Sequence, residues 1–255
     1  MSKKRSRQKR NDKKWKKGQV PKYMLKQQKQ EESFYSDQPK YFPPTNFKLF
    51  PKTERQKDLI DAIENFPITF GIGAFGTGKT FVAAGTIAKL WTSYEFEKII
   101  LARSNVPTGP TLGFFPGEPE EKLAHWLAPM LTVLRQALGA NKVDNMIKSG
   151  QIVLQPIETI RGSSFKDALV MVDEVQNLDL DTLKAITSRL GEDSHMILTG
   201  DPSQSDVRNG SDLEKFCEAV IRREMQIPVI VFGIEDIVRS GIAKELAIMF
   251  NEEGW

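Results

Sequence analysis

Short apolar runs alternate with longer amphipathic segments from residue 53 to residue 250. The runs have the length of strands, and the segments between them repeat apolar residues at spacings of three and four, which is typical of helices. The expected strands are 68–72, 98–102, 151–154, 167–172, 195–198 and 229–232, and the expected helices are 53–66, 81–90, 120–138, 141–149, 181–190, 213–223 and 240–250. This alternation predicts an α/β fold, with a doubly wound, mostly parallel sheet and helices on both faces.

A glycine-rich segment joins the first expected strand to the next helix. It reads Gly73-Ala74-Phe75-Gly76-Thr77-Gly78-Lys79-Thr80, and Phe81 follows it. The segment matches the phosphate-binding pattern GxxxxGK[ST], in the strand–loop–helix context that the pattern requires. Glycines let backbone N–H groups curl around phosphate oxygens, and the helix N-terminus adds unpaired donors. We expect residues 73–81 to bind ATP, with Lys79 at the β- and γ-phosphates and Thr80 on Mg²⁺.

The helix expected before this loop carries a glutamine that has two possible roles. Thr53 and Gln56 have the spacing of a capping box, in which the two residues satisfy each other's backbone N–H groups. In many helicase-like ATPases, a glutamine placed one short helix before the phosphate loop reads the adenine edge. The sequence leaves both roles open for Gln56.

Two carboxylates follow the most apolar expected strand, which ends immediately before Asp173 and Glu174. Ligands of parallel α/β sheets bind at the carboxyl ends of the strands. Two adjacent negative charges there need a counter-ion, and Mg²⁺ held by Thr80 and Asp173 would supply it. Glu174 is then expected to polarise a water for attack on the γ-phosphate. The pair favours hydrolysis over a small-molecule kinase, which must exclude water.

A third polar segment, Gly200-Asp201-Pro202-Ser203-Gln204, follows the strand expected at 195–198. The amide of Gln204 can both donate and accept hydrogen bonds. It could therefore sense a γ-phosphate or the attacking water. Asp-Pro-Ser is also favourable β-turn chemistry, and a simple turn is the alternative for this segment.

Residues 73–80, 172–177 and 200–204, in this order, resemble the motifs of superfamily 1 helicase ATPases. The resemblance to the PhoH family is closer, because three further segments are similar to its LGFLPG loop, its MRGRT segment and its D-x-V-R. These segments are residues 112–117, 160–165 and 236–239. The second of them lacks one arginine, and Ser240 stands where the family usually has His-Pro. The resemblance covers roughly residues 53–250, and it implies a RecA-like ATPase that forms a ring of subunits, with RNA as a candidate substrate.

A subunit ring also follows from the length of the chain. Superfamily 1 helicases complete their ATP site with arginines from a second ATPase domain in the same chain. The length of this chain allows a single ATPase domain. An arginine from a neighbouring subunit would then be needed, in a head-to-tail contact that can close a ring, with a hexamer favoured. The candidates are Arg103, Arg161 and Arg239, each of which could instead belong to a surface ion pair. We favour Arg239, and we expect it to couple hydrolysis to subunit movement together with Gln204.

Charge is unevenly distributed along the chain. Thirteen of the 36 basic residues but only one of the 33 acidic residues lie within positions 1–29, so the other residues carry a net charge of −9. We expect residues 1–30 to be a disordered basic extension, residues 31–52 a Pro- and aromatic-rich linker, and residues 53–255 the ATPase domain. Trp15 and Tyr23 could stack on bases while lysines hold phosphates, and a solubilising tail is the alternative.

The remaining features predict a cytoplasmic protein. The single cysteine, Cys217, cannot form an internal disulfide. No apolar run has the length of a membrane span, and the basic N-terminus lacks the apolar segment of a secretory signal.

The expected cofactors are ATP and Mg²⁺, and the expected partners are single-stranded RNA or DNA and further copies of the chain. Alternative functions are a nucleotide-dependent nucleic-acid-binding switch or scaffold and a small-molecule kinase. Some family members couple the ATPase to a toxin-like RNase, and no nuclease domain is visible in this sequence.

Overall fold

The structure, a computed structural model, describes residues 46–104, 119–160, 164–205 and 212–253. Four of the sequence predictions lie wholly or partly outside these residues: the basic extension, residues 31–45 of the linker, the segment 112–117 and Arg161. The chain divides into two units, residues 1–41 and 42–255. All of the described residues belong to the second unit, which corresponds to the expected ATPase domain with part of the expected linker.

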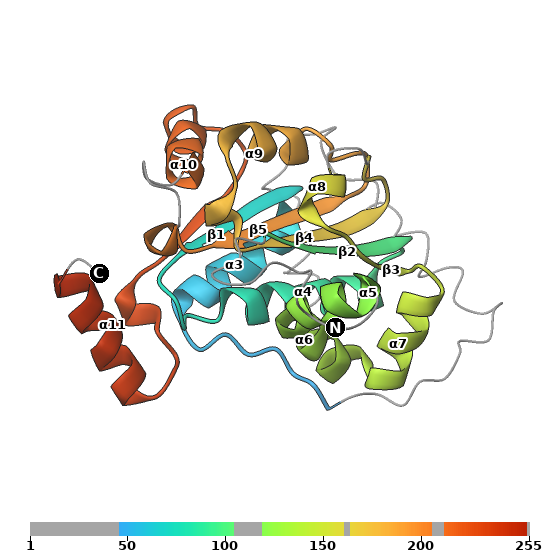
Figure 1. Cartoon of the computed structure of the whole chain (residues 1–255), viewed down its shortest axis with the longest axis horizontal. Helices are drawn as coiled ribbons and strands as arrows, with labels where there is room; N and C mark the ends of the chain where they lie inside the picture. The colour runs from blue at the N-terminus through green and yellow to red at the C-terminus, as the bar shows by residue number, and fades with distance from the viewer. Residues whose placement is uncertain (1–45, 105–118, 161–163, 206–211, 254–255) are drawn as a thin grey trace, which may run out of the picture. The chain divides into compact units, whose positions relative to one another are not determined.

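A six-stranded sheet forms the centre of this unit (Figure 1). Its strands are β1 (Ile68–Gly73), β2 (Lys98–Arg103), β3 (Ile152–Leu154), β4 (Ala168–Asp173), β5 (His195–Gly200) and β6 (Val229–Phe232). Their order across the sheet is β3-β2-β4-β5-β1-β6, and every pairing between them is parallel. All strands therefore end at the same edge, where the polar segments of the sequence were expected to meet.

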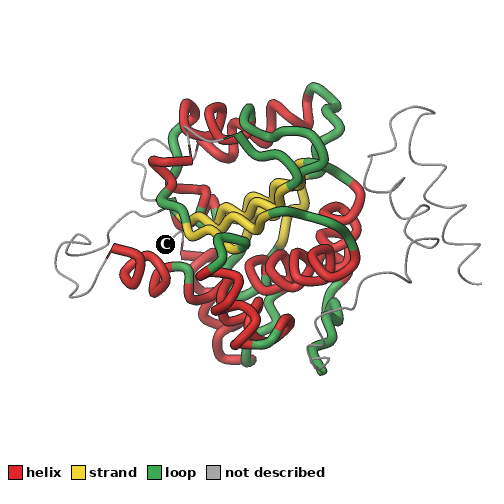
Figure 2. The backbone as a smooth tube through the Cα atoms, turned by 90° about the vertical axis from the view of Figure 1, so that its right-hand side faces the viewer, coloured by secondary structure: helices red, strands yellow, loops and turns green. Residues whose placement is uncertain are grey.

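Helices cover both faces of the sheet, as predicted. The helices α3 (Glu54–Asn65), α4 (Lys79–Ser93), α6 (Ala128–Leu138) and α7 (Ala140–Lys148) pack on one face, and α8 (Ile157–Ile160), α9 (Leu180–Thr187) and α10 (Asp212–Arg222) pack on the other. Figure 2 shows the strands as a single layer between the two sets of helices. Every residue of β4 is buried: Leu169 and Met171 belong to the first core, and Val170 and Val172 to the second. A strand buried on both faces reads as a continuous apolar run.

One expected helix is two helices in the structure. The segment predicted as a single helix at 120–138 forms α5 (Pro119–Trp126) and α6, and the break falls at Leu127. The reason is Pro129, in the first turn of α6, because proline has no N–H to donate and its ring clashes with the preceding turn of a continuing helix. The four-residue α8 was not predicted, because one turn is too short to show a periodicity. The last helix, α11 (Gly241–Glu253), follows β6 as expected.

The described part of the expected linker is extended and packs along the domain. Phe47 and Leu49 lie against the first core, and Gly85 of α4 makes room for them. A Cβ at Gly85 would lie 2.9 Å from Cδ1 of Leu49. The ring of Phe47 also lies 6.0 Å from that of Phe81, measured between centroids. Residues 46–52 therefore cover the side of α4.

None of the helices described here has both the length and the apolar character needed to cross a membrane.

Candidate nucleotide site

The glycine-rich loop joins β1 to α4 and is fixed from outside by the segment around β6. Gly73 has a φ of 119°, and a Cβ there would lie 2.1 Å from the carbonyl oxygen of Phe232. Ala74 N–H donates to that same carbonyl at 3.1 Å, and Val238 N–H donates to the carbonyl of Gly76 at 3.1 Å. These contacts fix the position of the loop at the N-terminus of α4, where the first-turn N–H groups have no partners within the helix.

The ammonium of Lys79 lies inside this loop. Its Nζ donates to the carbonyl oxygens of Gly73 at 2.6 Å and of Ala74 at 2.8 Å. Burial lowers the pKa of Lys79, and the nearby carboxylates of Asp201, Asp173 and Glu174 oppose this shift. Because the ammonium donates to carbonyl oxygens of the loop, it can exchange them for the oxygens of a phosphate.

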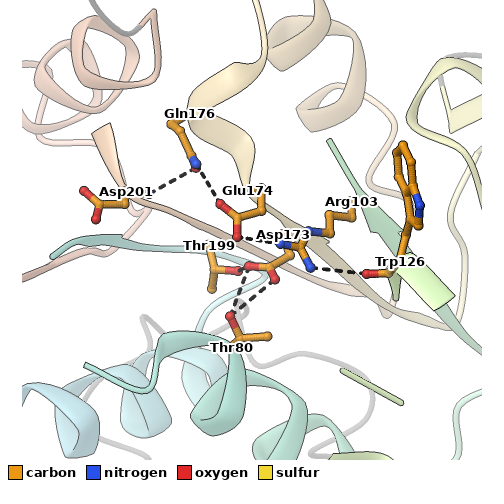
Figure 3. Close-up of polar contacts among 8 residues, drawn as sticks. All are labelled: Thr80, Arg103, Trp126, Asp173, Glu174, Gln176, Thr199 and Asp201. Carbon is orange, nitrogen blue, oxygen red and sulfur yellow. Dashed lines mark hydrogen bonds and ion pairs between the residues drawn. The ribbon is translucent and has the colours of Figure 1, made fainter. Parts of the chain in front are cut away.

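Asp173 lies opposite the start of α4, as predicted (Figure 3). The Thr80 hydroxyl donates to its two carboxylate oxygens at 3.2 and 3.3 Å. The Thr199 hydroxyl, which is fully buried, donates to Oδ1 at 2.5 Å. Burial raises the pKa of Asp173, and the hydrogen bond from Thr199 opposes this. A buried carboxylate at this position is stabilised by a cation.

The oxygens of Thr80 and Asp173 fit Mg²⁺, which prefers hard oxygen ligands and keeps several waters. No cluster of three or more His, Cys, Asp or Glu side chains suited to a metal occurs among the described residues. Mg²⁺ would therefore be held by one carboxylate and one hydroxyl together with phosphate oxygens and water, as is usual for nucleotide-dependent sites.

Glu174 follows Asp173 and has a φ of 56°, in the left-handed backbone region that residues other than glycine rarely adopt. Its carboxylate accepts hydrogen bonds from Arg103 Nη2 at 2.8 Å and from Gln176 Nε2 at 2.6 Å (Figure 3). The Glu174 side chain is 32 % exposed, so solvent water reaches it. The proposed base thus lies at the boundary between the sheet edge and the solvent.

Gln56 is buried at the outer side of the loop. Its Nε2 donates to the carbonyl of Thr77 at 2.8 Å, and its Oε1 accepts from Lys52 N–H at 2.7 Å. The Thr53 hydroxyl caps α3 by accepting from Gln56 N–H at 3.2 Å. The capping half of the prediction is therefore confirmed for Thr53, whereas the Gln56 side chain returns to Lys52 instead of Thr53. Gln56 supports the phosphate loop, and the reading of adenine stays a prediction.

The other candidates that the structure describes, Gln204, Arg239 and Arg103, line one cavity together with the phosphate loop. Arg161 is outside the described residues. Gln204 is exposed in the turn after β5, and that turn is a 3₁₀ helix capped by Asp201. Arg239 lies over its own phosphate loop, because a Cβ at Gly76 would be 3.1 Å from Cδ of Arg239. Arg103 pairs with Glu174 of its own chain. Two of the three candidate arginines therefore reach this site without a neighbouring subunit.

A cavity of about 660 Å³ brings the three polar segments together. It is lined by the phosphate loop, by the pair Asp173 and Glu174, by the turn from Gly200 to Gln204, and by Arg239. Phe75, Phe81 and Val238 add apolar surface to it, and Pro129 and Val133 of α6 line it as well. A single cavity lined by an ammonium, a hydroxyl, carboxylates and a glycine-rich loop has the groups that a nucleoside triphosphate requires.

The sequence reasoning missed two residues that contact the predicted carboxylates. Thr199 ends the apolar part of β5, and its hydroxyl reaches Asp173 in the neighbouring strand. Gln176 lies two residues after Glu174 and accepts a hydrogen bond from Asp201 N–H at 3.1 Å. The signal for Thr199 was a polar residue at the carboxyl end of a buried strand, next to the expected polar turn. Gln176 lies within the motif-like segment 172–177, but the direction of its side chain depends on the turn that follows Glu174 and could not be predicted from the sequence.

A model of the PhoH-like protein family matches residues 48–251. The chain belongs to the PhoH-like protein family. The "PhoH-like protein" of Synechocystis is 39 % identical over 158 residues, which cover 62 % of this chain and 48 % of that protein. "Protein PhoH" of Escherichia coli K12 is 32 % identical over 200 residues, covering 77 % and 56 % of the two chains. The chain thus spans about half the length of these curated relatives.

Among solved structures, the large terminase of a thermophilic bacteriophage aligns with a TM-score of 0.49 at 13 % identity. The alignment covers 78 % of this chain and 50 % of the terminase. A likeness of this size decides neither the activity nor the partners of the chain. The nucleotide-binding character of this PhoH-like domain rests on its phosphate loop and on its family.

Proposed function

We propose that this PhoH-like chain is a Mg²⁺-dependent ATPase. The observation that carries the proposal is the meeting of four groups at one cavity: the Lys79 ammonium, the Thr80 hydroxyl, and the carboxylates of Asp173 and Glu174. The groups come from two motifs that are 93 residues apart in the sequence, measured from Thr80 to Asp173. Each group has the chemistry that phosphoryl transfer to water requires.

The residues divide the reaction between them. Lys79 and the N–H groups at the start of α4 would bind the β- and γ-phosphates, and Thr80 and Asp173 would hold Mg²⁺. Mg²⁺, when bound, neutralises charge on the phosphate oxygens. Glu174 takes a proton from a water while the oxygen of that water bonds to the γ-phosphorus. The bond from the γ-phosphorus to the β–γ bridging oxygen breaks, which leaves ADP. Gln204 and Arg239 are proposed to respond to the loss of the γ-phosphate.

Solvent access to Glu174 favours hydrolysis over the kinase alternative. A small-molecule kinase must keep water from the γ-phosphate, and its base must face an acceptor pocket. The Glu174 side chain is about one-third exposed beside the loop. We therefore place water, and not a small-molecule hydroxyl, at this carboxylate.

We further propose that hydrolysis drives movement on single-stranded RNA or DNA and that the chain acts as a homo-oligomeric ring. The basic segment 1–29 supports the first part, since clustered lysines and arginines give salt-dependent, non-specific affinity for phosphates. Family membership supports both parts. A nucleotide-dependent binding switch without motor activity is the alternative, and it differs in showing no turnover that depends on the polymer.

The test is phosphate release from Mg²⁺–ATP by the full chain, alone and with single-stranded RNA or DNA, at low and moderate salt. Lys79→Ala is the matched variant, because it removes the ammonium that binds the phosphates. We expect turnover without any acceptor, loss of turnover in Lys79→Ala, and stimulation by one polymer that weakens with salt. Equal turnover in the two proteins would contradict the ATPase proposal. Turnover indifferent to both polymers would contradict the motor and leave the ATPase in place.

A further inference from the structure

The carboxylate of Glu174 is held from two sides. Arg103 contacts Oε1 and Gln176 contacts Oε2, at the 2.8 and 2.6 Å given above. Each carboxylate oxygen can accept about two hydrogen bonds. The two donors therefore fix the direction of the carboxylate and still leave acceptor capacity for a water on both oxygens.

Each of the two donors is itself anchored to a different element (Figure 3). Arg103 is the last residue of β2, and its Nη1 donates to the carbonyl of Trp126, the last residue of α5, at 3.2 Å. The Gln176 side chain is almost fully buried, and its Oε1 accepts from Asp201 N–H. The Ser205 hydroxyl donates to the backbone carbonyl of Gln176 at 3.1 Å. Hydrogen bonds through Arg103 and Gln176 thus connect the Glu174 carboxylate to α5 and to the turn after β5.

Glu174 needs such support for two physical reasons. Its backbone is in the left-handed region, which is strained for a residue other than glycine and persists only where the surroundings hold it. Its side chain has three rotatable bonds and is partly exposed, so without partners it would leave the orientation that proton transfer needs. A general base acts only when it lies within hydrogen-bond reach of the proton that it takes.

We propose that Arg103 and Gln176 are positioning residues for hydrolysis, which act through the Glu174 carboxylate and not on the nucleotide. This inference rests on the proposed ATPase function. It gives Arg103 a role in its own subunit, in place of the contact across subunits for which it was one of three candidates. It also makes the 200–204 turn part of the support of the base, through the hydrogen bond between Asp201 and Gln176.

The two residues should therefore affect kcat and leave ATP affinity unchanged. The phosphate-binding groups are Lys79, Thr80 and the loop N–H groups, and the hydrogen bonds described for Arg103 and Gln176 involve none of them. A misplacement of a reacting group by about 1 Å costs on the order of a hundredfold in rate. We expect Arg103→Gln and Gln176→Met each to lower kcat by about tenfold to a hundredfold. Arg103→Lys retains the charge and should restore part of the rate.

The deciding experiment is a double-mutant cycle with Glu174→Gln, measured as single-turnover phosphate release by the full chain with Mg²⁺–ATP. If the two residues act through the carboxylate, adding Arg103→Gln or Gln176→Met to Glu174→Gln lowers the remaining rate no further. The matched control is Arg135→Gln, which removes the 2.9 Å ion pair with Asp144 between α6 and α7, outside the cavity. This control should leave kcat unchanged.

Several outcomes would overturn the inference. One is a loss of rate of the same size in both backgrounds, which would mean direct contact with the nucleotide or a purely structural role. Another is a loss of ATP affinity that accounts for the fall in rate, and a third is an unchanged kcat in the single variants. If Glu174→Gln abolishes turnover while the Arg103 and Gln176 variants are fully active, only this inference fails. If the unmodified chain shows no turnover, the proposed function fails with it.

Discussion

A buried histidine should make the stability of this domain depend on pH. His195 begins β5, and its ring is 2 % exposed. Nδ1 lies 2.9 Å from the carbonyl oxygen of Ile63, and the ring meets Phe96 edge-on. Burial lowers the pKa of His195 to about 4. The neutral ring, with its proton on Nδ1, is thus the form that the folded domain keeps at neutral pH.

The size of the effect follows from the difference in pKa between the two states. An unfolded histidine has a pKa of about 6.5, so the unfolded chain binds the proton first as the pH falls. The stability contributed by the neutral ring is fully present above pH 6.5, declines below it, and is gone below about pH 4. At about 1.4 kcal/mol per pKa unit, the loss is about 2 kcal/mol at pH 5 and about 3 kcal/mol below pH 4.

The assay is urea unfolding of the unmodified chain and of His195→Gln at pH 7, 6 and 5. Glutamine retains an N–H donor for Ile63 but does not titrate. We compare the free energy of unfolding of the two proteins, because the contributions of other titrating groups cancel in the difference. We expect the stabilisation by histidine relative to glutamine to decrease by about 2 kcal/mol between pH 7 and pH 5. If the difference in free energy of unfolding between the unmodified chain and His195→Gln is the same at the three pH values, the reasoning is refuted.

Three substitutions test the local structure of the site. Gly73→Ala forces a Cβ against Phe232 at a positive φ, and it should lower the free energy of unfolding by at least about 2 kcal/mol and abolish ATP binding, as calorimetry would show. Thr53→Ala removes the cap of α3 and should cost about 1 kcal/mol in urea unfolding. Thr199→Val removes a donor to Asp173, so ATP binding should need about tenfold more Mg²⁺ in a titration. An unchanged value in any of these measurements would contradict the corresponding contact.

Most of the fold could be predicted because the strands are short apolar runs that end in polar residues. The run before Asp173 is buried on both faces of the sheet, which is why it is continuous in the sequence. The phosphate loop could be located because its chemistry fixes residue types at fixed spacings. The break before α6 was missed although Pro129 is visible in the sequence, because the apolar stripe continues through it.

The contacts between strands could not be predicted, because the order of the strands is not written in any local pattern. Arg103 meets Glu174 only because β2 lies beside β4. Thr199 meets Asp173 only because β5 lies on the other side of β4. The sequence therefore marked Arg103 as a candidate without its partner, and it assigned no role to Thr199 or to Gln176, although Gln176 lies within the motif-like segment 172–177.

The most direct test of the central claim compares ATP binding and phosphate release in the unmodified chain and in Glu174→Gln. Glutamine has nearly the same shape as glutamate but cannot take the proton of the attacking water. We predict the same Kd for Mg²⁺–ATP in the two proteins and a phosphate-release rate lower by about a hundredfold or more in Glu174→Gln. Equal rates with equal ATP binding would show that Glu174 is not the base, and the account of this site would be wrong.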